Sequence, residues 1–161
     1  MFKRILVLSL LLSGCALTTP TTFSEEALND TMLNIQQKEL PFKDILKAHK
    51  GKKVLLNVWA SWCRDCLVAL PKLKDFQRAN PDVSYVFVST DRNAAVWKKA
   101  LKKYNIKGAH YFMKDGMDSA FGNFLNSNWI PRYLVINENG FVDLFKAKQI
   151  TDIRIANALK K

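Results

Sequence analysis

Apolar runs alternate with amphipathic stretches along most of the chain. Residues 53–59 (KVLLNVW) and 83–89 (VSYVFVS) are nearly continuous apolar runs, typical of strands buried on both faces of a sheet. A short strand is expected at residues 109–113. Residues 132–136 and 141–145 predict a pair of strands joined by the turn-forming sequence NENG.

Helical spacing of apolar residues characterises the segments between and around these strands. Helices are expected at residues 23–33, 40–49, 63–79, 93–104, 118–125 and 151–159. Pro71 should kink the third of them, because proline removes a helical hydrogen bond. The order of elements predicts an α/β fold, a central mixed β-sheet flanked by helices on both faces. We place this domain at residues 23–161.

The N-terminal segment has a different pattern. Two basic residues precede an apolar run at residues 5–12, which is too short to span a bilayer as a permanent helix. The sequence LSGC that follows, ending at Cys15, resembles a bacterial lipobox. We therefore predict a lipoprotein signal peptide at residues 1–14, and a lipidated Cys15 with a polar tether at residues 15–22. The alternative is an ordinary secretory signal, but no small-x-small cleavage site is evident.

A lipid anchor would place the protein outside the cytoplasm, on a membrane facing the periplasm. Ala16 after the lipidated cysteine favours the outer membrane slightly over the inner one. The net charge of the whole chain is +11. In this compartment we expect no nucleic acid partner. The charge fits a solvated lysine-rich surface, attraction to an anionic membrane, or acidic partners.

The segment WASWCRDCLVALP holds the other two of the chain's three cysteines, Cys63 and Cys66. A zinc site needs about four ligands, and only His49 and His110 could complete one. Haem attachment would need a histidine at position 67, which is leucine. A structural disulfide is possible, but so small a loop gains little chain entropy. We therefore expect no metal and no cofactor beyond the dithiol.

The position of the pair favours redox chemistry. It follows a buried strand and begins a helix, where the helix dipole and free backbone N–H groups stabilise a thiolate at Cys63. Cys66 lies one helical turn further on and is expected to be more covered. Cys63 is then the nucleophile, and Cys66 the thiol that resolves the mixed disulfide.

Three features carry a family resemblance: the segment NVWASWCRDC, Pro71, and the segment WIPRYLVINENG. They resemble the thioredoxin superfamily and, more narrowly, TlpA/ResA-like membrane-anchored thiol–disulfide oxidoreductases, over roughly residues 40–160. The resemblance implies a thioredoxin-like fold and a cis-proline at Pro131; the alternative is a trans-proline that opens a strand. It also implies that the backbone beside Pro131 pairs with an extended substrate segment. The expected groove residues are Trp62, Ile130, Pro131 and Arg132.

The chain departs from that family at two positions near the cysteines. Thioredoxin has a buried aspartate where this chain has Asn57. TlpA/ResA-like proteins often have a glutamate where this chain has Ala69. The carboxylates that usually assist proton transfer at the second cysteine are therefore absent.

The dipeptide between the cysteines, Arg64 and Asp65, often contains proline in the family. Arg64 favours a thiolate at Cys63, as Arg132 would if it lay nearby. Asp65 opposes the thiolate but is favourable in the first turn of a helix. We hypothesise that Asp65, or a water, replaces the missing base. Alternatively, the dipeptide is an exposed ion pair without a catalytic role.

Together these features predict a thiol–disulfide oxidoreductase that exchanges disulfides with extracytoplasmic proteins, with reduction as the working direction. Its partners would be disulfide-bearing or dithiol proteins, and a membrane redox partner that recycles the dithiol. The alternative is a thioredoxin-fold binding protein, such as a metal or apocytochrome carrier, that keeps the pair without turnover. The missing carboxylates are the main support for that alternative.

Overall fold

The computed structural model describes residues 19–161. The predicted signal peptide, the predicted lipidation site Cys15 and the first part of the tether lie outside the described residues. Within the described part, no helix is long and apolar enough to cross a membrane.

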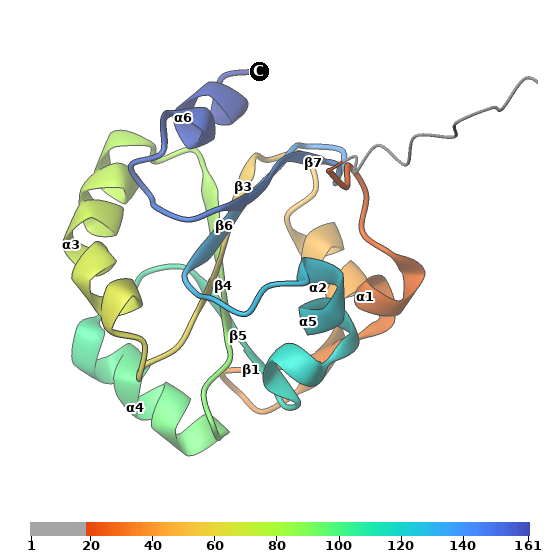
Figure 1. Cartoon of the computed structure of the whole chain (residues 1–161), viewed down its shortest axis with the longest axis vertical. Coiled ribbons are helices and arrows are strands. Elements are labelled where there is room, and N and C mark those ends of the chain that lie inside the picture. The colour runs from red at the N-terminus through yellow and green to blue at the C-terminus, as the bar shows by residue number, and fades with distance from the viewer. Residues whose placement is uncertain (1–18) are drawn as a thin grey trace, which may run out of the picture.

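A single seven-stranded sheet with the order β2-β1-β5-β4-β3-β6-β7 lies at the centre (Figure 1). The strands are β1 (Thr31–Asn34), β2 (Glu39–Pro41), β3 (Val54–Trp59), β4 (Ser84–Ser89), β5 (Ala109–Met113), β6 (Arg132–Ile136) and β7 (Val142–Ala147). Strands β3, β4 and β5 are parallel, and the other pairings are antiparallel. The predicted mixed sheet is therefore confirmed.

Helices cover both faces of this sheet. They are α1 (Glu25–Asn29), α2 (Phe42–Ala48), α3 (Arg64–Ala79), α4 (Ala94–Tyr104), α5 (Ala120–Leu125) and α6 (Ile153–Leu159). Helices α3, α4 and α6 lie on one side, and α1, α2 and α5 on the other (Figure 1). Helix α3 continues through Pro71 and ends at Ala79, as the apolar spacing predicted.

The helix predicted at residues 23–33 is wrong in its second half. Helix α1 ends at Asn29, and the chain then forms the hairpin β1–β2. Met32 is fully buried because β1 pairs with β5, which is distant in the sequence. The hairpin turn depends on Asn34, whose Oδ1 accepts hydrogen bonds from the backbone N–H groups of Gln36 and Lys38. Residues 35–38 (IQQK) contain no glycine, proline, asparagine or aspartate, so Asn34 was the one turn signal in this stretch.

The central strand β3 positions the cysteine segment. Every residue of β3 is buried, which accounts for the continuous apolar run. On one face, α3 contributes Cys66, Leu70 and Leu73 to the core. The site therefore begins at the end of a fully buried central strand.

His110 in β5 should make the stability of the fold depend on pH. Its Nε2 lies 2.9 Å from the Ile106 carbonyl oxygen, and its buried Nδ1 has no partner in the described part of the chain. The ring stacks on Phe87 with centroids 5.0 Å apart. Burial lowers the pKa of His110, opposed in part by the hydrogen bond with Ile106. A proton on Nδ1 would have no acceptor, so the folded protein favours the neutral ring.

We expect the melting temperature to fall as the pH is lowered through about 6.5, where the histidine of the unfolded chain takes up a proton. This contribution to stability is fully present above that pH and is lost below it. Circular dichroism melts at a series of pH values should show a shallower fall for His110→Gln. His49→Gln should also make the fall shallower, because the pKa of His49 is also lowered, by burial and by Lys52. A wild-type slope in His110→Gln would contradict this assignment.

Candidate active site

Cys63 lies at the junction of β3 and α3. It is the N-cap residue of α3, with extended backbone, and its Sγ accepts a hydrogen bond from the Cys66 backbone N–H at 3.1 Å. The turn before it is closed by the Cys63 N–H, which donates to the Ala60 carbonyl at 3.2 Å. The predicted strand-to-helix position of the pair is confirmed.

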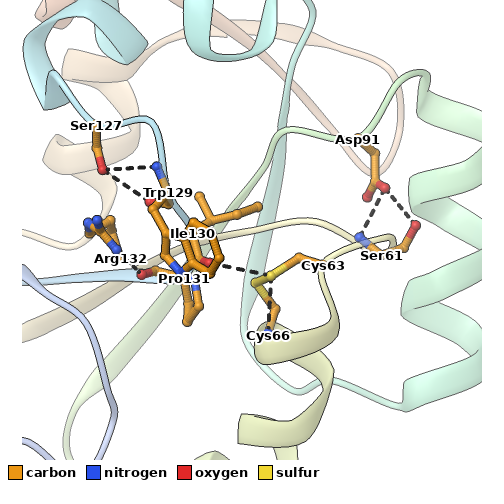
Figure 2. Close-up of a disulfide and its surroundings, with 9 residues drawn as sticks. All are labelled: Ser61, Cys63, Cys66, Asp91, Ser127, Trp129, Ile130, Pro131 and Arg132. Atoms are coloured by element: carbon orange, nitrogen blue, oxygen red, sulfur yellow. Dashed lines mark hydrogen bonds between the residues drawn. A yellow bond between two sulfur atoms is a disulfide. The ribbon is translucent and has the colours of Figure 1, made fainter.

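Cys63 and Cys66 form a disulfide with their Cα atoms 5.3 Å apart (Figure 2). The exposed fraction is 6% for Cys63 and 4% for Cys66, so the expected difference in cover is small. The reason is the segment around Ile130, whose carbonyl oxygen lies 3.5 Å from Cys63 Sγ. Both cysteines are thus covered in the disulfide form.

The segment facing the disulfide precedes β6. The peptide bond between Ile130 and Pro131 is cis, as the resemblance implied, and both residues are buried. Ser127 orders the approach to it: its hydroxyl donates to the Trp129 carbonyl at 3.0 Å and accepts from the Trp129 N–H at 3.5 Å (Figure 2). This turn brings Trp129 to the side of the dithiol.

An open hollow of about 460 Å³ is lined by Cys63 of the pair. Trp62 and Trp129 are 60% and 59% exposed there. The lining residues are Trp62, Cys63, Arg64, Asp65, Asn128, Trp129 and Ile130. Trp129 was missed by sequence reasoning, although a tryptophan directly before an Ile-Pro pair is a signal that could have identified it.

A second hollow of about 410 Å³ adjoins the first and shares Asp65 and Trp129 with it. Pro131 lines this second hollow. Lys72 and Lys148 also line it, and among the described residues neither is in an ion pair. Two hollows therefore flank the position of the expected groove.

Arg132 does not line either hollow, in contrast to the prediction. It is the first residue of β6 and is 7% exposed. Its Nη1 donates to the Pro131 carbonyl at 2.9 Å, and in Figure 2 the side chain points away from the cysteines. Burial lowers the pKa of its guanidinium. The alternation of side chains along a strand places Arg132 on the opposite side from the dithiol.

The other departures from the family lie where the sequence placed them. Arg64 and Asp65 are exposed, and neither is in an ion pair within residues 19–161. Asn57 is buried in β3, and no described residue hydrogen-bonds its Oδ1. Ala69 lines the second hollow. Asp65 is therefore the carboxylate that both hollows share.

A buried acid close to the site was not foreseen. Asp91 follows β4 and is 3% exposed. It accepts hydrogen bonds from Ser61, which precedes the cysteine pair (Figure 2). Sequence reasoning considered only the segments around the cysteines and so missed it. Across residues 19–161, no group of three or more His, Cys, Asp or Glu side chains could hold a metal ion.

Comparisons with known proteins agree with this geometry. A family model described as thioredoxin-like matches residues 51–142. Thioredoxin-2 of Pyricularia oryzae is 34% identical over 101 residues, 62% of this chain and 55% of that protein. Sporulation thiol-disulfide oxidoreductase A of Bacillus subtilis is 25% identical over 153 residues, 92% of each chain.

A solved structure has the same fold. The solution structure of a Bacteroides vulgatus protein, assigned to the thiol–disulfide oxidoreductases, superposes with a TM-score of 0.67. The two sequences are 27% identical, and the aligned region covers 81% of this chain and 83% of that chain. The family match extends over more than half of this sequence and includes the cysteine pair. The chain belongs to the thioredoxin-like family, as a TlpA/ResA-like member.

Proposed function

We propose that the protein is a thiol–disulfide oxidoreductase acting on extracytoplasmic proteins. The observation that carries this proposal is the Cys63–Cys66 disulfide, which lies at the start of a helix and whose Cys63 lines an open hollow. A disulfide between residues three apart adds little to stability, so its value lies in opening and closing. The names of the relatives support the same chemistry.

In the reducing direction, the Cys63 thiolate attacks one sulfur of a substrate disulfide. That bond breaks, the departing substrate sulfur takes up a proton, and a mixed disulfide with Cys63 forms. The Cys66 thiol then loses its proton and attacks Cys63 Sγ. The substrate leaves with two thiols, and the protein keeps the disulfide and has given up two electrons. A membrane redox partner would return them.

Local polarity supports the division of roles. The Cys66 N–H already points at Cys63 Sγ, and the first turn of α3 adds its dipole, so negative charge is favoured at Cys63. Arg64, in the same turn, adds positive charge. These interactions stabilise a thiolate at the attacking sulfur.

The proton of Cys66 needs an acceptor because Asn57 and Ala69 cannot supply one. Asp65 lines both hollows, and we assign the role to Asp65 or to a water that enters there. In Asp65→Asn, the rate of the second step measured by stopped flow should fall if Asp65 is the base. An unchanged rate would leave the role to water.

The location follows from the predicted anchor. We propose that Cys15 is lipidated and holds the protein on a membrane facing the periplasm. The Val142 N–H donates to the Thr21 carbonyl at 2.7 Å, so the chain enters the domain where β7 begins. Because Val142 pairs with Ile136, at the end of β6 far from Pro131, the dithiol would face away from the anchor.

Trapping of mixed disulfides tests the function. A Cys66→Ala variant should form covalent complexes with substrate proteins that are visible on non-reducing gels, because the resolving thiol is missing. The double variant Cys63→Ala with Cys66→Ala is the control and should trap nothing. A carrier without turnover would give no covalent complexes with the single variant. The reduction potential gives the direction: a value near about −270 mV favours a reductant and one near about −120 mV an oxidant.

Trp129 should contribute to the binding of protein substrates. Replacement by alanine removes an exposed aromatic surface beside Cys63 and should lower kcat/KM for a protein disulfide by roughly tenfold. The rate with dithiothreitol, which is too small to contact Trp129 and Cys63 together, should stay unchanged. Phe141→Ala is a matched control, since Phe141 is also exposed but lies at the opposite end of β6. Equal losses with the protein disulfide and with dithiothreitol would contradict this role.

A further inference from the structure

Asp91 is a buried carboxylate whose hydrogen bonds all go to two serines. Its Oδ1 accepts from the Ser61 N–H at 3.0 Å and from the Ser61 hydroxyl at 2.6 Å. Its Oδ2 accepts from the Ser89 hydroxyl at 2.8 Å, and the Asp91 N–H donates back to that hydroxyl at 3.0 Å. No cation pairs with Asp91 in the described part of the chain.

Ser61 belongs to the short segment that joins β3 to α3 and ends at Cys63. Two backbone hydrogen bonds fasten this segment: Thr90 N–H to the Trp59 carbonyl at 2.9 Å, and Cys63 N–H to the Ala60 carbonyl at 3.2 Å. Between these two points, the Asp91 carboxylate is the side chain that holds the segment to the neighbouring strand β4 (Figure 2). The start of α3 is thus tied to β4.

A buried carboxylate is costly unless hydrogen bonds compensate it. The carboxylate accepts two hydrogen bonds from one residue, which fixes both the backbone and the side chain of Ser61. The arrangement is therefore suited to holding Ser61 in one position.

We propose that Asp91 is a positioning residue for disulfide exchange, acting through Ser61 to hold Cys63 Sγ against the Ile130 carbonyl. The proposal rests on the proposed exchange activity. Exchange requires the attacking sulfur to approach the target bond in one geometry, and a displacement of about 1 Å can slow a reaction by on the order of a hundredfold. A loose Ser61 would let Cys63 and the N-terminal turn of α3 move relative to the substrate groove.

Four variants test this role in the full-length protein. Asp91→Ala removes the hydrogen bonds made by the carboxylate, and Ser61→Ala removes only the bond from the hydroxyl. Asp91→Asn keeps Oδ1 as an acceptor for both Ser61 donors and removes the charge. Asp143→Ala is the matched control: Asp143 accepts from Lys53 at 3.1 Å and from Asn137 at 3.0 Å, at the opposite end of the sheet.

Each folded variant is measured in three ways: exchange rate with a protein disulfide, rate of alkylation of Cys63 across pH, and thermal unfolding. Asp91→Ala should exchange at least about tenfold more slowly and show a shifted pH profile of alkylation. Asp91→Asn should stay within about twofold of wild type in exchange. Asp143→Ala should unfold at a lower temperature and keep the wild-type exchange rate and alkylation profile.

Several outcomes would overturn the proposal. A folded Asp91→Ala protein with the wild-type exchange rate and alkylation profile would do so. An Asp91→Asn variant as slow as Asp91→Ala would show that the charge matters rather than the position. If Asp91→Ala does not fold, Ser61→Ala takes its place. A wild-type exchange rate and a wild-type pH profile of Cys63 alkylation in Ser61→Ala would then overturn the proposal. Absence of exchange in the wild type would refute the proposed function, while alkylation would still report on Cys63.

Discussion

Replacing Cys63 with serine should lower the rate of disulfide exchange by a factor on the order of 10³ or more. A serine hydroxyl fits the same N-cap position and can accept the same N–H from Cys66, so the fold should persist. It cannot form a disulfide with the substrate. The loss is therefore a loss of chemistry, measured as insulin reduction or as oxidation of a model dithiol peptide.

Cys66→Ser provides the comparison for this result. It keeps the nucleophile and lacks the resolving thiol, so it should react once and remain in the mixed disulfide. Mass spectrometry of the wild-type, Cys63→Ser and Cys66→Ser proteins after incubation with substrate distinguishes these states. Substantial exchange by Cys63→Ser would mean that Cys66 attacks substrates, and the assignment of the two roles would be reversed.

The largest expected loss of stability follows from Phe42→Ala. Phe42 begins α2, is fully buried, and packs against Phe23 with ring centroids 4.9 Å apart and against Phe121 at 4.6 Å. It links α2 to α5 and to the segment before α1, on one face of the sheet. Truncation of a buried phenylalanine costs about 3–5 kcal/mol in free energy of unfolding.

Urea denaturation of the oxidised protein measures this effect. Phe141→Ala is the same chemical change at a half-exposed position and should alter the free energy of unfolding by about 0.5 kcal/mol or less. A loss below about 1 kcal/mol for Phe42→Ala would mean that the aromatic cluster collapses around the vacated space. The loss in free energy of unfolding should therefore be several times larger for Phe42→Ala than for Phe141→Ala.

The sequence allowed prediction of the elements that bury continuous apolar surface. Strands β3, β4 and β6 follow from such runs, and the cysteine pair from its place after β3. The hairpin β1–β2 could not be predicted because its stability comes from pairing with β5. Strands as short as β2 carry too few residues for a periodic signal.

The site was predictable only where neighbours in sequence are neighbours in space. Cys63, Cys66 and Trp62 meet this condition. Asp91 acts across two strands, and its importance comes from hydrogen bonds that no spacing rule encodes. Arg132 shows the converse: it adjoins Pro131 in sequence, but strand geometry turns its side chain away from the dithiol.

The two edge strands of the sheet, β2 and β7, are built in ways that disfavour aggregation through strand addition. Strand β2 has only three residues and ends in Pro41, which has no N–H to donate. Strand β7 pairs irregularly with β6, and Lys146 within it has a φ of 58°. Short, proline-ended or distorted edges are poor templates for a further strand. A protein substrate therefore finds no regular, open edge on which a strand of its own could extend this sheet.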